Sequence, residues 1–339
     1  MKAIVMQGGT DAAYVTDRPE PKLRDDYVLV DVKAVAINPT DWKHVEFLNH
    51  KGLLSGCDYA GIVVDVGKNA KKAWKKGERV AGLAHGGNSL QPEDGAFAER
   101  IVARSGGQFR IPESMSYEEA ATLGVAIITV GQGMYQQMKL NWPNNPTKSG
   151  EWILIYGGSS GMGTIGILFA KLSGYKVVTT CSPRNFDLAK SFGADVVFDY
   201  NDPKATEKIN KLTNNDLKYV WDTISEESTA EFCSKVISAG GTHGFIGRNK
   251  PSREDIKIVY SLGYTAAGEA VDKGMIKVSA EDAAKDYEWM ITWVDGVQEL
   301  LDAGKIKAHP PKVTKGLENI IPGLEEIKTI SGKKLVYTL

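Results

Sequence analysis

The pattern of apolar and polar positions divides the chain into two kinds of segment. Up to about residue 115, short apolar or alternating runs separated by glycine and proline predict strands at 3–6, 27–36, 60–66 and 99–102. From residue 152, strand-like runs (152–156, 176–180, 196–198, 219–222 and 242–246) alternate with helix-like runs (165–173, 186–192, 204–212 and 228–237). Such alternation predicts a parallel sheet covered by helices on both faces.

The segments between and after these regions suggest where the domains join. A capping box at Ser116–Glu119 predicts the start of a helix over 120–138. After Gly263 the alternation stops, Ser279 caps a long helix that ends near Leu301, and residues 333–339 predict a strand that returns to the N-terminal region. We therefore predict one domain from residues 1–120 plus 266–339 and an inserted domain from residues 121–265.

Composition and charge argue against several classes of protein. The chain has 339 residues and a formal net charge of -1, and its short lysine pairs do not form a basic patch, so no nucleic-acid partner is expected. It has no apolar run of 18 residues and no signal-peptide core at its start, which predicts a cytoplasmic protein without a membrane partner. Three scattered cysteines are too few for a disulfide framework.

A glycine-rich turn follows the strand predicted at 152–156. Gly161, Gly163 and Gly166 match G-x-G-x-x-G and lead directly into an apolar helix. Such a turn binds a dinucleotide pyrophosphate through backbone amides and the positive end of the helix dipole. The predicted contacts are Gly158, Ser159, Ser160, Gly161, Met162 and Gly163. The alternative is an ordinary strand-to-helix crossover with no ligand.

The loop after the next strand indicates which dinucleotide binds. NAD enzymes place an acidic residue there, about twenty residues after the glycines, on the ribose 2′-hydroxyl. Here the loop reads Cys-Ser-Pro-Arg-Asn, and Ser182, Arg184 and Asn185 can donate to a 2′-phosphate instead. This favours NADPH as the cofactor, although Arg184 could also be an exposed residue on a polar loop.

Several motifs together carry a family resemblance. They are Asn-Pro-Thr-Asp-Trp-Lys at 38–43, Gly-Cys-Asp-Tyr-Ala-Gly at 56–61, Asp-Gly-Ala-Phe-Ala-Glu at 94–99, Tyr-Gly-Gly-Ser at 156–159, the run at 181–190 and Ser-Gly-Lys-Lys-Leu-Val at 331–336. With them the chain resembles the medium-chain dehydrogenase/reductase superfamily, and within it the fungal trans-acting enoyl reductases that assist polyketide synthases, as in lovastatin biosynthesis. The resemblance implies an α/β fold in which a Rossmann-type doubly wound parallel sheet is inserted in a GroES-like, β-rich catalytic domain.

Zinc-dependent members of that superfamily resemble this chain but differ at the metal ligands. They place a cysteine at the position of Asn38 and a His-Glu pair at the position of Cys57-Asp58. With three cysteines in the whole chain, neither the four-cysteine structural site nor the usual Cys, His and Cys catalytic set can be assembled. No metal is expected. Without a Lewis acid, reduction of an activated C=C bond is favoured over alcohol oxidation, because the substrate's own carbonyl stores the developing charge.

The resemblance implies an NADPH-dependent oxidoreductase that transfers a hydride to the β-carbon of a conjugated carbonyl or acyl thioester, with a polyketide synthase as a partner. It places the catalytic roles on Lys43, Thr40 and Thr129. Lys43 would stabilise an enolate or supply a proton, and the two threonine hydroxyls would position the nicotinamide and the acyl carbonyl. Lys43 could also be a surface lysine, and Thr129 could hydrogen-bond within its own helix.

The resemblance also adds residues around the cofactor. These are Asn38 and Asp41 near the nicotinamide, Tyr200 beside the adenosine phosphate, Gly247 after the fifth strand, and Leu335 with Val336 closing the site. Tyr200 could equally serve packing. The five histidines are scattered and form no H-E-x-x-H motif, so each is interpreted as structural.

Other functions remain open at this point. A quinone oxidoreductase or an aldehyde reductase could use the same scaffold, and they differ from an enoyl reductase in the product formed. A non-catalytic NADPH-binding sensor or docking protein would use the fold only to change shape. The presence of Asn38, Thr40, Lys43 and Thr129 together favours an enzyme.

Overall fold

The chain folds into two compact units. A computed structural model describes residues 1–247, 249–274 and 276–339. Unit 1 comprises Met1–Ile128 and Gly263–Leu339, and unit 2 comprises Thr129–Leu262. The sequence places the domain junctions at 120/121 and 265/266, near these positions.

Unit 1 is built around a sheet that is antiparallel except for one parallel pair of strands, β17 (Pro311–Lys315) and β18 (Lys334–Thr338). Its strands lie in the order β17, β18, β3 (Tyr27–Ala36), β5 (Asp58–Val66), β6 (Arg79–Leu83) and β8 (Phe109–Arg110), and β7 (Arg100–Arg104) also pairs with β3. Along β3, Val28, Val30 and Val32 are buried and alternate with half-buried residues, because successive side chains point to opposite faces. This alternation places one face of the sheet against the core.

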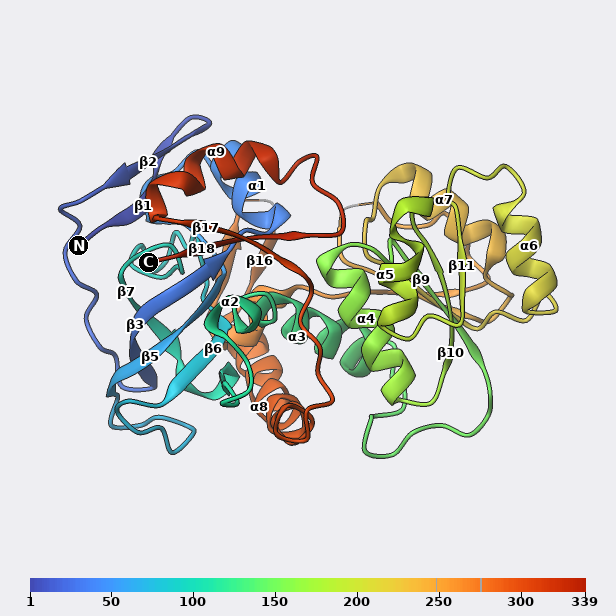
Figure 1. Cartoon of the computed structure of the whole chain (residues 1–339), viewed down its shortest axis with the longest axis horizontal. Helices are drawn as coiled ribbons and strands as arrows, with labels where there is room; N and C mark the ends of the chain where they lie inside the picture. The colour runs from blue at the N-terminus through green and yellow to red at the C-terminus, as the bar shows by residue number, and fades with distance from the viewer. Residues whose placement is uncertain (248, 275) are drawn as a thin grey trace. The chain divides into compact units, whose positions relative to one another are not determined.

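Smaller elements complete unit 1. They are a sheet of β1 (Ala3–Gly8), β2 (Asp11–Val15) and β4 (Lys51–Leu54), the helices α1 (Pro39–Phe47) and α9 (Ile320–Glu326), the hairpin of β15 (Val271–Lys273) and β16 (Ile276–Val278), and the long helix α8 (Ala280–Asp302). Ser279 caps α8 by accepting from the Asp282 N–H, as the sequence predicts. The predicted C-terminal strand is also confirmed, because β18 pairs antiparallel with β3 (Figure 1).

Unit 2 contains a six-stranded parallel sheet. The strand order is β11 (Val196–Phe198), β10 (Lys176–Thr180), β9 (Trp152–Tyr156), β12 (Tyr219–Asp222), β13 (Thr242–Phe245) and β14 (Lys257–Tyr260). Figure 1 shows these strands flanked by α4 (Gly161–Leu172), α5 (Phe186–Ser191), α6 (Ala205–Leu212) and α7 (Glu227–Val236). The first strand, β9, is central and the order reverses beside it, which is the doubly wound Rossmann arrangement. The predicted fold class is confirmed.

One predicted helix differs from the structure, and several strands, β14 among them, were not predicted. The helix predicted over 120–138 is divided into α2 (Tyr117–Ala120), α3 (Gly124–Val130) and a π-helix, η2 (Gly131–Gln137). Gly124 lies so close to β6 that a Cβ there would come 2.2 Å from the Gly82 carbonyl oxygen. The strand β14 was not predicted, because its exposed ends, Lys257 and Tyr260, hide the strand pattern. No helix in the described part of the chain is long and apolar enough to cross a membrane.

Candidate active site

A hydrogen-bonded group in unit 1 joins residues that are far apart in sequence. Thr40 and His44 lie one turn apart on α1, and Tyr264 lies in the short helix η4 (Gly263–Ala267). The Tyr264 Oη lies 2.7 Å from the His44 Nε2 and also hydrogen-bonds the Thr40 Oγ1. The Thr40 Oγ1 is 3.3 Å from the same nitrogen. His44 is buried, whereas Thr40 and Tyr264 are half-buried.

A cation and a second imidazole lie against the Tyr264 ring. The Lys273 ammonium is 4.6 Å from the ring centroid, and it donates to the carbonyls of Gly86 at 2.9 Å and Gly87 at 2.7 Å. The His85 ring stacks on Tyr264 with centroids 4.9 Å apart. Burial lowers the pKa of Lys273 to about 8, so the amine remains mostly protonated at neutral pH. Burial, together with the Lys273 charge, holds the pKa of His44 and of His85 well below the ordinary value, which keeps both imidazoles neutral.

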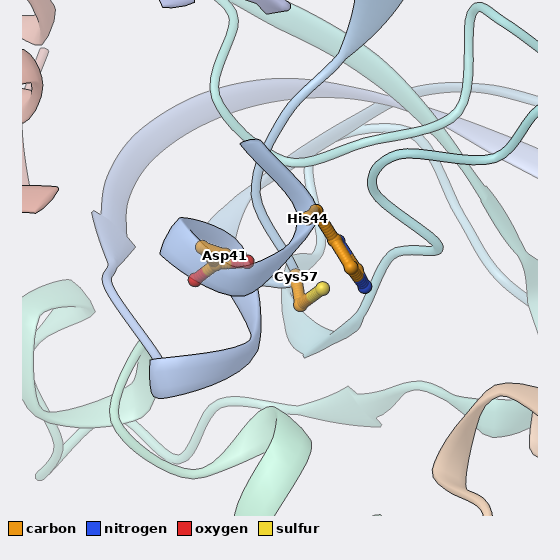
Figure 2. Close-up of side chains that lie close together, drawn as sticks. All are labelled: Asp41, His44 and Cys57. Atoms are coloured by element: carbon orange, nitrogen blue, oxygen red, sulfur yellow. The ribbon is translucent and has the colours of Figure 1, made fainter. Parts of the chain in front are cut away.

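His44 also belongs to a buried group, which it forms with Asp41 and Cys57 (Figure 2). Asp41 and His44 come from α1, and Cys57 precedes β5. Asp41 closes the helix cap by accepting from the Asn38 N–H at 2.7 Å. Burial raises the pKa of Asp41 to about 7 and raises the pKa of the Cys57 thiol well above its ordinary value. Near neutral pH the His44 imidazole and the Cys57 thiol are therefore uncharged, whereas the Asp41 carboxyl is partly ionised.

Asn38 belongs to a second buried group. Its side-chain Nδ2 donates to the Asp58 Oδ2 at 2.8 Å, and its Oδ1 accepts from the Lys334 Nζ at 2.7 Å. Lys334 also pairs with Asp58 at 2.5 Å, and Asp58 accepts from the Val125 N–H. These contacts join α1, β5, β18 and α3. They give Asn38 a structural role in unit 1, and its predicted contact with a nicotinamide stays a prediction.

The remaining predicted residues of unit 1 differ in exposure. Lys43 is exposed on α1, with its Nζ 5.6 Å from the Trp42 ring centroid. Leu335 and Val336 are buried in β18. Thr129 is the first residue of unit 2, and it is buried in α3. The structure brings Thr40 into the Tyr264 group, and the roles predicted for Lys43, Thr129, Leu335 and Val336 stay predictions.

The glycine turn of unit 2 has little space around it. Gly157 has a φ of 81°, and a Cβ on Gly163 would come 2.2 Å from the Gly157 carbonyl oxygen. Ser160 caps α4 by accepting from the Gly163 N–H at 2.9 Å. The six predicted contacts, Gly158, Ser159, Ser160, Gly161, Met162 and Gly163, all lie on the turn between β9 and α4 or on the first residues of α4. The backbone is thus compact at the carboxyl end of the central strand, as a dinucleotide turn requires.

Polar side chains gather after the next two strands of unit 2. The Ser182 Oγ, after β10, lies 3.2 Å from the Tyr200 Oη, after β11. Tyr200 is 43 % exposed, so a large part of its surface remains open to a ligand. Arg184 is exposed and Asn185 half-buried on the same loop as Ser182. On the other side of β9, Gly247 lies beside Ser225, whose Cβ is 2.5 Å from where a Gly247 Cβ would stand.

Comparison with known proteins places the chain in a family. Residues 24–113 match the alcohol dehydrogenase GroES-like domain, and residues 161–295 match the zinc-binding dehydrogenase domain. The trans-enoyl reductase resD of Aspergillus sclerotiorum is 43% identical over 99% of both chains. The chain belongs to the medium-chain dehydrogenase/reductase superfamily, among the fungal trans-enoyl reductases. TOXD of Cochliobolus carbonum, another trans-enoyl reductase, is 52% identical over 79% of this chain and 91% of its own.

Solved structures share the fold of this reductase. The CurK enoyl reductase superposes with a TM-score of 0.78 at 19% identity, over 99% of this chain and 98% of its own. A putative zinc-dependent alcohol dehydrogenase from Rhizobium etli superposes with a TM-score of 0.79 at 24% identity, over 100% of this chain and 98% of its own. Solved structures named for different reactions therefore share this architecture, so the function has to be inferred from the residues of the site.

The zinc implied by one family description does not suit the residues present. Asp41, His44 and Cys57 offer ligand atoms within 4.8 Å of one another, and the Asp41 Oδ1 and the His44 Nδ1 have no hydrogen-bond partner among the described residues. The His44 Nε2, however, is engaged by Tyr264 and Thr40. The buried Lys273 ammonium interacts electrostatically with Asp41 and Cys57, so it already supplies a positive charge. A divalent ion would add charge beside that ammonium, and we derive no catalytic step through a metal.

Sequence reasoning missed four residues of this site: His44, His85, Tyr264 and Lys273. The two histidines were interpreted as structural because no catalytic motif contains them. Tyr264 and Lys273 lie between Gly263 and Ser279, a segment in which the sequence predicts no site residue. Polar residue types in that segment were the only available signal, because the contact between Tyr264 and His44 spans 220 positions.

Proposed function

We propose that this protein reduces the activated C=C bond of an α,β-unsaturated acyl thioester with NADPH, as a trans-acting enoyl reductase of a polyketide pathway. The observation that carries the proposal is the similarity to trans-enoyl reductases over 99% of this chain at 43% identity. The hydroxyl and imidazole groups around Tyr264 support it, because an enolate needs hydrogen-bond donors rather than a Lewis acid.

Unit 2 would hold the cofactor. The turn after β9 is tight enough for backbone amides to reach a pyrophosphate, and Ser182, Arg184, Asn185 and Tyr200 would surround a 2′-phosphate. No acidic residue stands among Cys181–Asn185 to bind a ribose 2′-hydroxyl, which favours NADPH over NADH. When bound, NADPH supplies a hydride to the substrate. Gly247 is proposed to lie beside the same cofactor.

The catalytic roles proposed at the substrate fall on Lys43, Thr40 and Thr129. Lys43, exposed on α1, would approach the carbonyl oxygen and stabilise the negative charge that develops there. Thr40, half-buried and hydrogen-bonded to Tyr264, would help to orient the carbonyl or the nicotinamide, and Thr129 would act with it. Asn38, Asp41, Leu335 and Val336 would support the nicotinamide end of the site.

The substrate could be a free conjugated carbonyl or an acyl group on a carrier. The relatives named trans-enoyl reductases favour an acyl thioester presented by a polyketide synthase. A quinone oxidoreductase from Pseudomonas syringae shares the fold with a TM-score of 0.73, but at 22% identity this likeness concerns architecture alone. The quinone, aldehyde and sensor alternatives are therefore kept as outcomes of the test.

The test is NADPH oxidation over a panel of enals, enones, enoyl thioesters and quinones, with every product identified by mass spectrometry. We expect turnover with 2-enoyl thioesters and formation of the saturated thioester. Quinol formation without alkene reduction would support the quinone alternative. Reduction of a carbonyl to an alcohol would support the aldehyde reductase. NADPH binding without turnover of any panel member would support the sensor.

A further inference from the structure

The position of Tyr264 suggests that it does more than pack. Its hydroxyl is the one group that touches both the Thr40 hydroxyl and the His44 imidazole in the contacts described for unit 1. Its ring contacts His85, which stacks on it, and Lys273, whose ammonium lies 4.6 Å from the ring centroid. The side chain is half-buried, so its orientation is restricted while part of its surface remains accessible.

The surroundings of His44 indicate the direction of its hydrogen bond. The Nδ1 is buried and has no partner among the described residues, whereas the Nε2 lies 2.7 Å from the Tyr264 Oη. A buried N–H without an acceptor costs more than a buried lone pair without a donor, so the proton of the neutral ring belongs on the Nε2. We assign this tautomer from the hydrogen bonds. His44 then donates to the Tyr264 oxygen, and the tyrosine's own hydrogen is left to donate to the Thr40 hydroxyl or to a substrate.

Two further features favour the loss of that hydrogen. The His44 N–H would remain on the oxygen after the proton has left, and it would stabilise the phenolate. The Lys273 ammonium, held by the Gly86 and Gly87 carbonyls, would gain attraction to the ring when the ring becomes an anion. Both partners are therefore arranged for the phenolate more than for the phenol, which is the arrangement that a proton donor needs.

We propose that Tyr264 is the proton donor to the α-carbon of the substrate, with His44 and Lys273 as its positioning residues. This inference rests on the proposed function. Addition of a hydride to the β-carbon breaks the C=C π bond, and its electron pair becomes the enolate. The enolate α-carbon then forms a C–H bond with the Tyr264 proton, and the O–H electron pair stays on the phenolate. A solvent water returns a proton to the phenolate, which completes the cycle.

The decisive variant is Tyr264→Phe, which keeps the ring against His85 and Lys273 and removes only the hydroxyl. With a 2-methyl-2-enoyl thioester and NADPH, we expect kcat to fall about a hundredfold or more, as for the loss of a general acid. The NADPH dissociation constant should stay unchanged. The α-carbon should change from a single configuration to a mixture, because solvent would then protonate the enolate from either face. Tyr14→Phe, which removes a hydroxyl from β2, is the matched control and should behave like the wild type.

A second pair of variants tests His44. His44→Gln can keep an N–H near the position of the Nε2, whereas His44→Leu cannot. We expect His44→Gln to retain most of the rate and the single α-configuration, and His44→Leu to resemble Tyr264→Phe. If His44 had only a structural role, loss of its side-chain N–H would not change the configuration at the α-carbon of the product. This pair therefore gives a result even if Tyr264→Phe fails to fold.

The outcomes separate this inference from the proposed function. If the wild type reduces alkenes and both Tyr264→Phe and His44→Leu keep its rate and its single α-configuration, the Tyr264 assignment is overturned and the proposed function stands. If the wild type reduces no alkene of the panel, the proposed function fails and this inference fails with it.

Discussion

The two units present their functional residues in different ways. In unit 2 the proposed cofactor contacts come largely from two short local segments, the turn after β9 and the loop after β10. In unit 1 the polar group around Tyr264 combines α1, the loop that carries His85 and the segment from Gly263 to Lys273. A dinucleotide turn is therefore visible in the sequence, whereas the chemistry of unit 1 appears only after long-range pairing.

This difference has a physical origin. A pyrophosphate is bound by backbone amides at a helix N-terminus, and the local sequence determines whether the backbone can take that shape. A side-chain network needs several groups at hydrogen-bonding distance, and any part of the chain can supply them. The fold shared with other family members thus indicates how the cofactor binds. The side chains of unit 1 indicate which substrate binds and which residue donates the proton.

Among the variants that test the difference between the two units, Lys43→Met is expected to have the largest effect on kcat. If Lys43 stabilises the enolate oxygen, kcat on a conjugated thioester should fall about a hundredfold while NADPH affinity stays nearly unchanged, because that interaction exists mainly in the transition state. Steady-state kinetics and equilibrium NADPH binding measure both quantities. Lys51→Met, at an exposed lysine of β4, is the control. A Lys43→Met enzyme that keeps more than about a third of wild-type kcat would remove Lys43 from the chemistry of unit 1.

The corresponding change in unit 2 is Arg184→Ala. Loss of one charge-assisted contact to the 2′-phosphate should weaken NADPH binding about tenfold to a hundredfold. NADH binding should change little, because NADH lacks that phosphate. Binding titrations with both cofactors measure the difference, and Lys211→Ala, which removes the same charge from α6, serves as the control. Equal losses for both cofactors would mean that Arg184 does not contact the phosphate.

The buried histidines of the two units differ in their contacts: His44 and His85 contact Tyr264, whereas His243 of unit 2 does not share such a group within the part of the chain that the structure describes. His243 in β13 has no exposed surface, and neither ring nitrogen has a hydrogen-bond partner among the described residues. Burial lowers the pKa of His243 to about 4, below its ordinary value of 6.5. The folded state therefore binds fewer protons than the unfolded state between these values. The stability associated with the neutral ring is complete above pH 6.5 and is lost as the pH falls towards 4.

We therefore expect His243→Leu to reduce the acid sensitivity of unit 2. At pH 5 the wild type should have lost about 2 kcal/mol of unfolding free energy through this group, and the variant should not lose it. Denaturant unfolding of both proteins at pH 5 and pH 8 measures the difference. His50→Leu, at an exposed position of unit 1, is the control. Parallel losses in the wild type and in His243→Leu would assign the acid sensitivity to other groups.

The smallest effect is expected from metal removal. Because Lys273 supplies a positive charge beside Asp41 and Cys57, exhaustive chelation should leave turnover intact. Elemental analysis of the purified protein and activity before and after chelation test this. Stoichiometric zinc in protein never exposed to added metal, with activity lost on its removal, would contradict the interpretation of unit 1.

The sequence was most informative where the pattern is local. The strands at 27–36, 152–156 and 176–180 have the predicted bounds, because 27–36 alternates and the other two are mainly apolar runs. The helix predicted at 120–138 is interrupted at 121–123, and α3 begins at Gly124 against Gly82, a tertiary contact that no local pattern encodes. Similarly, His44 and His85 were interpreted as structural, because their shared partner Tyr264 lies about two hundred residues away along the chain.

In the proposed reaction, NADPH bound by unit 2 would give a hydride to the β-carbon and Tyr264 of unit 1 would protonate the α-carbon. The most direct test is to reduce a 2-enoyl thioester with NADPH deuterated at the transferable C4 position in ordinary water, and then with unlabelled NADPH in heavy water. We predict one deuterium at the β-carbon in the first product and one at the α-carbon in the second. Deuterium at the carbonyl carbon, or a product whose C=C bond remains intact, would contradict this reaction.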